Sequence, residues 1–225
     1  MIEKSAVCVL VPAYNEEKNI GRVIEGLISR GFPVIAVDDG STDNTASILR
    51  SSKAQHILSP VNQGKGAAIR KGFDWVLRNN FEAVIVMDSD GQHDPDELEH
   101  FLSALNSGEA DLVVGNRMGD PKGMPLLRRL TNRGMSGLIS AIAGQKIPDT
   151  QCGYRALTRR ALKNLILYSD RYEIESEMIL AAARKKLKIK SIPISSVYRD
   201  EVSNIRPFRD TMRFFKFLFR FIFSR

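Results

Sequence analysis

The chain has 225 residues, a formal net charge of +7 and a hydrophobic content of 43%. That length suits one large α/β domain, or one domain with a short appendage, and the composition is that of an ordinary globular protein. Its two cysteines exclude a disulfide framework and indicate a reducing compartment. We expect no signal peptide, and no apolar run reaches the roughly 18–20 residues that span a bilayer. The positive charge favours phosphate-bearing partners, which include nucleotides, nucleic acid and anionic lipid.

Apolar strands and amphipathic helices alternate along the first half of the chain. The predicted strands are Val7–Val11, Pro33–Val37, Gln55–Leu58, Ala83–Met87 and Asp111–Val114. The predicted helices between them are Glu17–Arg30, one ending near Arg50, one opening at Asn62–Gly66, and Pro95–Asn106. This alternation is typical of a parallel sheet with right-handed crossovers.

The pattern changes after Arg117, where a turn-rich stretch, Gly119–Pro125, begins. The predicted helices beyond it are Leu126–Ala143, Leu157–Leu167 and Ile174–Lys186, with a loop at Pro148–Tyr154. A final predicted strand, Lys188–Ser195, carries apolar residues at alternate positions. We find no internal repeat and no low-complexity linker in the sequence.

Two carboxylates follow the apolar run Ala83–Met87 directly. Such a run is typical of a strand buried on both faces in a parallel sheet. Asp88 and Asp90 are two apart on an extended chain and can therefore face one point, at the edge of the sheet where ligands bind. This arrangement favours a divalent metal that holds a diphosphate. The alternative is an acidic loop in which Asp94 or Asp96 caps the following helix.

Three further motifs follow predicted strands or open a helix. They are Pro12-Ala13-Tyr14-Asn15-Glu16, Val37-Asp38-Asp39-Gly40-Ser41-Thr42-Asp43 and Asn62-Gln63-Gly64-Lys65-Gly66. Later matches are Val113–Arg117, Asp149–Arg155 and a cluster of Glu173, Glu175 and Glu177. In this order the motifs resemble those of the family 2 glycosyltransferases, and most closely the dolichol-phosphate or polyprenyl-phosphate mannosyl- and glucosyltransferases. The resemblance runs from about Val7 to Arg213.

The resemblance implies a single α/β domain of GT-A type, with a mostly parallel Rossmann-like sheet flanked by helices. It also implies the donor site. The positions that match nucleoside contacts are Pro12, Tyr14, Glu16, Val37 and Asp39, and Lys65 and Ser89 complete the donor-binding set. The matching metal positions, for Mg²⁺ or Mn²⁺, are Asp88, Asp90 and Gln92. Asp38 and Asp39 could instead cap a helix, and Lys65 could instead be a solvated helix residue. His93 is expected not to bind metal.

The acceptor side of the resemblance involves basic residues. Arg117 is expected near the donor or acceptor phosphates, and Arg133 and Ser136 resemble acceptor-phosphate residues; a solvated helix face is the alternative for these arginines. A hydroxyl acceptor would require a general base, for which the candidates are Asp149, Glu175 and Glu177, whereas a lipid phosphate is already ionised. We expect Asp149 to contact the sugar, and at most one of the two glutamates to face the site because they are two apart on a helix.

A loop, Tyr198–Pro207, resembles one that closes over the donor in relatives. Those relatives carry a Ser-Lys pair whose lysine touches phosphate, whereas this chain has Ser203-Asn204. Arg199 or Arg206 is the expected replacement for the missing charge.

The tail, residues 207–225, is expected to form a basic aromatic helix that follows a glycosyltransferase domain of residues 1–206. Its basic residues, Arg209, Arg213, Lys216 and Arg220, are spaced to form one stripe, and phenylalanines cover most of the rest. This pattern favours an interfacial helix on an anionic membrane. The alternative is a helix packed on the core or on a dimer partner.

The sequence therefore predicts a metal-dependent, inverting glycosyltransferase that moves a hexose from a nucleotide sugar to polyprenyl or dolichyl phosphate. The predicted location is cytoplasmic, peripheral at the cytoplasmic face of a membrane, with no nucleic-acid partner. One alternative is the same fold acting on a hydroxyl of a glycan or glycolipid. The others are a nucleotidyltransferase and a non-catalytic binding protein.

Overall fold

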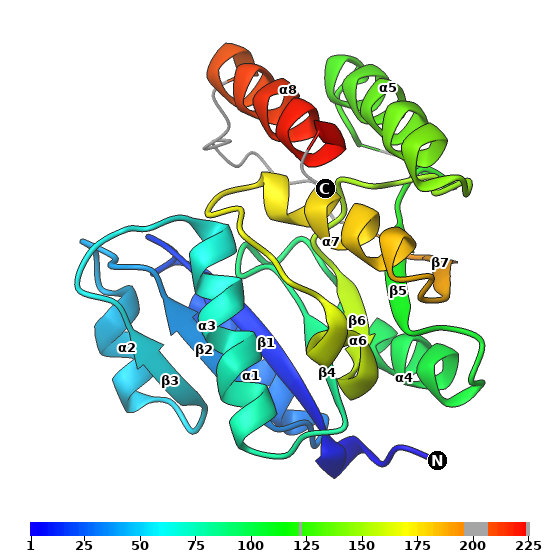
Figure 1. The fold of residues 1–225 in the computed structure, drawn as a ribbon. Coiled ribbons are helices and arrows are strands. Elements are labelled where there is room, and N and C mark those ends of the chain that lie inside the picture. The colour runs from blue at the N-terminus through cyan, green and yellow to red at the C-terminus, as the bar shows by residue number, and fades with distance from the viewer. Residues whose placement is uncertain (122, 196–206, 224–225) are drawn as a thin grey trace.

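A central β-sheet organises the molecule in the computed structural model (Figure 1). The structure describes residues 1–121, 123–195 and 207–223. Within them the sheet has seven strands in the order β3-β2-β1-β4-β6-β5-β7. Their bounds are β1 Val7–Ala13, β2 Val34–Asp38, β3 Gln55–Leu58, β4 Ala83–Val86, β5 Leu112–Asn116, β6 Arg155–Thr158 and β7 Ile189–Pro193. Every neighbouring pair is parallel except the two that involve β6, so the predicted mostly parallel α/β fold is confirmed.

Helices cover the sheet and connect its strands. They are α1 Ile20–Ser29, α2 Thr45–Ser51, α3 Lys65–Arg78, α4 Leu98–Asn106, α5 Leu126–Ala143, α6 Arg159–Asn164, α7 Glu173–Arg184 and α8 Pro207–Phe223, with short 3₁₀ turns at Lys4–Ala6 and Pro95–Glu97. Helix α3 packs on β1 and β2, and α4 packs on β5 and β6. Helices α5 and α8 both pack on α7 and lie at the same end of the molecule (Figure 1).

The central strands are buried along their whole length. Every residue of β1, β2 and β4 is buried, as the continuous apolar runs predict for strands with helices on both faces. Helix α3 approaches β1 closely at Gly72, where an added Cβ would lie well inside 3.0 Å of the Leu10 side chain. Glycine at this position therefore permits the close packing of helix and strand.

We expect Gly72→Ala to destabilise the protein by about 1–3 kcal/mol, because the extra methyl group overpacks a filled core. Gly137→Ala on α5 is the matched control, since an added Cβ there meets open space, and it should be neutral or stabilising by up to about 1 kcal/mol. Urea denaturation of both variants measures the two changes. Equal stability of the two variants would contradict the close packing.

Strand β6 corrects the sequence analysis, which predicted a helix over Leu157–Leu167. Residues Arg155–Thr158 instead form a strand inserted antiparallel between β4 and β5, and α6 begins only at Arg159. The Thr158 side chain caps that helix by accepting a hydrogen bond from the Ala161 backbone N–H. Four residues are too few to show a period, so the pairing partners of β6 decide its conformation.

Helix α8 packs on the protein with one face and exposes the other. Phe214 and Leu218 are buried against the rest of the protein, and the Arg184 guanidinium lies 3.8 Å from the centre of the Phe221 ring. Its other face is exposed, with Phe215 at 55% and Phe219 at 67% of their full exposure. None of the helices in the described part of the chain has the length and apolar character needed to cross a membrane.

Candidate active site

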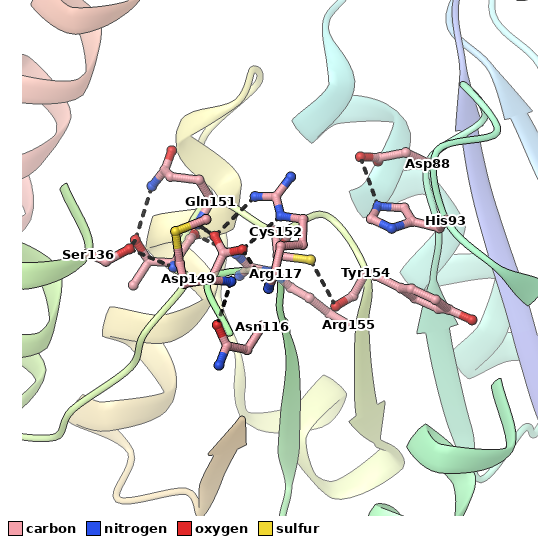
Figure 2. Close-up of polar contacts among 12 residues, drawn as sticks. Asp88, His93, Asn116, Arg117, Ser136, Asp149, Gln151, Cys152, Tyr154 and Arg155 are labelled. Carbon is pink, nitrogen blue, oxygen red and sulfur yellow. Dashed lines mark hydrogen bonds and ion pairs between the residues drawn. The ribbon is translucent and has the colours of Figure 1, made fainter. Parts of the chain in front are cut away.

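The carboxyl ends of the parallel strands carry the predicted site residues. Strand β4 leads into Asp88, β5 leads into Arg117, and the loop at 149–154 returns to the same edge because β6 runs the opposite way. Figure 2 shows Asp88 with His93 on one side, and Asp149, Arg117 and Ser136 on the other. Ligands of open α/β sheets bind at this edge, and the topology brings the predicted residues together there.

Lys65 links two carboxylates from distant parts of the chain. Its Nζ lies 2.7 Å from Asp88 Oδ1 and 2.6 Å from Glu175 Oε1. Burial alone would lower the pKa of Lys65, but the two carboxylates outweigh burial and raise it. Burial would likewise raise the pKa of Asp88, yet Lys65 and His93 hold it well below its usual range. Both groups are therefore charged at neutral pH, and Lys65 is not a solvated helix residue.

The start of α3 is built to bring Lys65 to this position. An added Cβ at Gly64 or Gly66 would lie well inside 3.0 Å of the backbone oxygens of Asp170 and Ser169. The Ala67 N–H donates to the Asp170 carbonyl at 3.1 Å. The two glycines thus let the segment before α7 pack directly on the start of α3, which explains why Lys65 meets Glu175.

Asp90 supplies the second carboxylate of the motif. Burial and the neighbouring charge of Asp88 raise the pKa of Asp90 above its ordinary value, and its Oδ1 accepts from the Gln92 N–H at 2.9 Å. Ser89 between them is buried. Two crowded carboxylates favour a cation, because a cation relieves their repulsion. The capping role that the sequence offered as the alternative is also present. The Asp94 side chain accepts from the Asp96 N–H and caps the 3₁₀ turn Pro95–Glu97.

Two carboxylates and a diphosphate suit Mg²⁺ or Mn²⁺. The protein alone does not complete such a site: among the described residues, no three His, Cys, Asp or Glu side chains are grouped to hold a metal ion. Asp88 Oδ1 meets the Lys65 ammonium as an ion pair at 2.7 Å, and a carboxylate oxygen has two lone pairs, of which one such contact uses only one. This oxygen therefore keeps lone-pair capacity for a cation, and the donor set fits a metal whose remaining ligands come from substrate phosphates.

His93 supports Asp88 from the interior. The His93 Nε2 lies 3.8 Å from Asp88 Oδ2, and its ring packs on Tyr154 (Figure 2). The Tyr154 ring in turn stacks on Phe101. His93 is buried in this aromatic stack. The packing fixes the orientation of the ring, which is the role expected of a residue that holds a carboxylate in place.

Gly153 packs directly against the Asp88 carboxylate. An added Cβ at this position would lie well inside 3.0 Å of both Asp88 oxygens. Gly153→Ala should displace that carboxylate and weaken Mn²⁺ binding in the presence of nucleoside diphosphate by about 10-fold or more. Electron paramagnetic resonance of free Mn²⁺ measures the affinity, with Gly119→Ala as the control because an added Cβ there meets open space. Unchanged affinity in Gly153→Ala would show that Asp88 is not part of the metal site.

Arg117 and Asp149 form a buried ion pair. The Asp149 side chain has no exposed surface, and its oxygens accept from Arg117 Nε at 2.7 Å and from Nη2 at 3.0 Å. The Arg117 N–H donates to the same carboxylate at 3.2 Å. The sequence analysis expects Asp149 to contact the sugar; in the structure its buried carboxylate binds Arg117 and orients that side chain.

The two predicted acceptor-phosphate residues face different surroundings. Arg133 is exposed on α5, whereas Ser136 is buried, and its hydroxyl oxygen accepts from the Thr150 N–H at 2.9 Å. Ser136 therefore holds the loop that carries Asp149. One turn earlier on the same helix, Asn132 is buried, and its Nδ2 has no hydrogen-bond partner in the described structure.

The predicted nucleoside residues lie together at the ends of β1 and β2. Pro12 pairs with Val37 across these strands, and Tyr14 is partly exposed beyond them. The Glu16 carboxylate accepts from Asn19 Nδ2 at 3.1 Å. Asp39 is buried, and its carboxylate accepts from the backbone N–H groups of residues 63 and 64. The structure thus gives Asp39 the role of shaping the loop that precedes Lys65.

Glu175 and Glu177 point to different surroundings, as their spacing predicts. Glu175 contacts Lys65, whereas the Glu177 carboxylate accepts from the backbone N–H groups of Tyr168 and Ser169 at 3.0 and 2.8 Å. The sequence analysis assigned no role to Gly153 or Arg155, although both lie in the quoted motif at 149–155. The predicted closing loop, Tyr198–Pro207, lies outside the described residues except for Pro207, with which α8 begins.

The family model for glycosyl transferase family 2 matches residues 8–166. The chain belongs to glycosyl transferase family 2. It is therefore a glycosyltransferase, and this membership decides against the nucleotidyltransferase alternative.

Named relatives cover most of the chain. The chain is 32% identical over 217 residues to the UDP-N-acetylglucosamine–dolichyl-phosphate N-acetylglucosaminyltransferase of Methanococcus voltae, covering 86% of each protein. It is 30% identical over 207 residues to the polyprenol monophosphomannose synthase of Mycolicibacterium smegmatis, covering 85% of this chain and 77% of that protein.

A solved structure shares the fold. Glucosyl-3-phosphoglycerate synthase of Mycobacterium tuberculosis, crystallised with Mn²⁺, UDP-glucose and phosphoglyceric acid, superposes with a TM-score of 0.72 at 21% identity, covering 96% of this chain and 77% of that one. This similarity confirms the GT-A-type fold.

Proposed function

We propose that this glycosyltransferase transfers a hexose-type sugar from a nucleoside diphosphate sugar to polyprenyl or dolichyl phosphate, with Mg²⁺ or Mn²⁺. The reaction is a single displacement with inversion. The named relatives use different sugars, N-acetylglucosamine in one case and mannose in the other, but both names specify a polyprenol-type lipid. The lipid acceptor is therefore the property that carries over best.

One observation supports the phosphate acceptor above all. Each of the three candidate bases is engaged by a partner: Asp149 by Arg117, Glu175 by Lys65, and Glu177 by backbone N–H groups. A hydroxyl acceptor needs a base that removes its proton, whereas an ionised phosphate needs only to be positioned. The engaged carboxylates fit the second kind of acceptor.

The donor side follows from the carboxylate cluster. Asp88 and Asp90 would hold the divalent ion, which neutralises the departing nucleoside diphosphate. Lys65 carries a positive charge beside Asp88, where it would meet the donor phosphates. The strand ends that carry Pro12, Tyr14 and Val37 would hold the nucleoside.

The proposed acceptor site combines hydrogen-bond donors that the protein holds in place with one that is exposed. Arg117 is held rigidly by Asp149, so its positive charge is fixed at the end of β5. The buried amide of Asn132 offers an N–H group without a partner in the described structure. Arg133, exposed on the same helix, can approach a phosphate from the outside. These groups together would bind the acceptor phosphate and leave one oxygen directed at the sugar.

Two helices at the same end of the molecule support a position at a membrane surface. The outer face of α8 exposes Met212, Phe215, Phe219, Ile222 and Phe223, and the start of α5 exposes Leu126, Leu127 and Leu130. Basic residues lie beside both apolar sets, which suits an anionic lipid surface. Both cysteines are free and buried, which suits the cytoplasmic face.

Replacing Phe215 and Phe219 with glutamine should reduce binding to anionic phospholipid vesicles by about 10-fold or more, because both rings are exposed on α8. Vesicle co-sedimentation measures the change. Ile166→Gln with Tyr168→Gln is the matched control, since these side chains are also exposed but do not belong to α8 or α5. Equal loss in both double variants, or no loss in either, would contradict the membrane surface.

The direct test of the function is a transfer assay with a panel of radiolabelled nucleotide sugars, Mn²⁺ or Mg²⁺, and polyprenyl phosphate. We expect solvent-extractable label with one donor, and we expect EDTA to abolish it. If label instead enters a glycan or glycolipid hydroxyl and never the lipid phosphate, the alternative acceptor is correct.

A further inference from the structure

Arg155 is a fully buried arginine at the edge of the sheet that carries the site. It is the first residue of β6 and has no exposed surface. It pairs with Val86 of β4 and with Val114 of β5, which places it between the carboxyl ends of both strands. A buried guanidinium is costly unless its donors are satisfied, so its partners indicate what this arginine does.

The guanidinium of Arg155 binds two separate segments at once. Its Nε donates to the Cys152 carbonyl and its Nη2 to the Thr150 carbonyl, each at 2.8 Å, and its Nη1 donates to the Glu175 carbonyl. A planar fork of N–H groups can hold three carbonyls in fixed directions, whereas a lysine ammonium cannot reproduce that geometry. One side chain therefore joins the 149–152 loop to the first turn of α7.

Each joined segment carries one half of the site. The 149–152 loop carries Asp149, which holds Arg117, and we name this pair the arginine half. The first turn of α7 carries Glu175, which holds Lys65 against Asp88, and we name these three residues the carboxylate half. The loop also continues into Gly153, on which the Asp88 carboxylate packs.

We propose that Arg155 is a positioning residue that fixes the carboxylate half and the arginine half relative to one another. The identity of the substrates bound by each half rests on the proposed function. The positioning itself depends only on the hydrogen bonds of this chain. Loss of the guanidinium hydrogen bonds should make both the 149–152 loop and the first turn of α7 more mobile, because the same side chain binds them both.

Arg155→Lys tests this role because it keeps the charge and removes the fork. Hydrogen exchange should become faster both in residues 149–153 and in residues 173–177. Mn²⁺ binding in the presence of UDP or GDP, measured by electron paramagnetic resonance, should weaken by about 10–100-fold. Arg155→Gln, which keeps two N–H donors without the charge, is measured in parallel in case the lysine variant does not fold.

Arg159→Lys is the matched control. Arg159 also donates to backbone carbonyls, those of Phe81 at 2.8 Å and Leu77 at 2.9 Å, but at the opposite end of β6. The Arg159→Lys variant should have a lower thermal stability, with unchanged hydrogen exchange in residues 149–153 and 173–177 and unchanged Mn²⁺ affinity. A purely structural role of Arg155 would give the same pattern as this control.

The results separate two failures. If the wild-type protein binds no Mn²⁺ with any nucleoside diphosphate, the proposed donor is wrong, and the exchange data still decide the role of Arg155. If folded Arg155→Lys or Arg155→Gln shows faster exchange in only one segment, or in neither, the positioning role is overturned.

Discussion

Asp90→Asn should abolish sugar transfer, by about 100-fold to 1000-fold or more, while the folded protein becomes equally or slightly more stable. The loss of activity follows because Asp90 supplies one of the two carboxylates proposed to hold the divalent ion, which stabilises the departing diphosphate. The gain in stability follows because burial and Asp88 raise the pKa of Asp90, so the folded state favours its uncharged form. A neutral amide of similar shape removes that repulsion.

This opposite effect on activity and stability distinguishes a functional carboxylate from a structural one. Thermal unfolding without metal and transfer rates with Mn²⁺ should be measured on the same preparation. Asp96→Asn is the control, because Asp96 is exposed and paired with Arg30, and its rate should stay within about twofold of wild type. If Asp90→Asn keeps more than a tenth of the activity, Asp90 is not a metal ligand.

Asp149→Ala should destabilise the protein by about 3–5 kcal/mol, because it leaves the Arg117 guanidinium buried without its carboxylate. Activity should fall as well, since Arg117 loses its orientation. The double variant Asp149→Leu with Arg117→Met removes both charges and should recover most of the stability, because apolar groups can replace a buried ion pair. It should not recover activity.

Urea denaturation of Asp149→Leu, Arg117→Met and the double variant measures the coupling between these residues. Lys190→Ala with Glu109→Ala is the control pair, because that ion pair is exposed, is screened by solvent and should change stability little. If the double variant regains transfer activity, the charge of Arg117 has no part in the reaction. If Asp149→Ala costs less than about 1 kcal/mol, the ion pair is not a structural support.

The sequence predicted the central sheet and its ligand edge because the relevant signals are local. Continuous apolar runs mark β1, β2 and β4 as buried on both faces, and the carboxylates Asp88 and Asp90 follow the last of these directly. The period of the helices and the glycines around Lys65 are equally local. The shared edge then follows from parallel topology alone.

The remaining features depend on contacts between residues far apart in sequence. Strand β6 is four residues long, and its neighbours rather than its composition make it a strand. The Asp149 carboxylate binds Arg117, 32 positions away in the sequence. Asp39 likewise binds the backbone of a loop about 24 positions away. No local pattern contains such partners.

The central claim is that the acceptor brings its own negative charge, because the candidate bases are already engaged. Transfer to polyprenyl phosphate and to the corresponding polyprenol, with the same donor, metal and detergent, tests this claim most directly. We predict label in the phosphate lipid alone, with no product from the alcohol above background. Equal or faster transfer to the alcohol would contradict the account, because it would require a base that one of these carboxylates must supply.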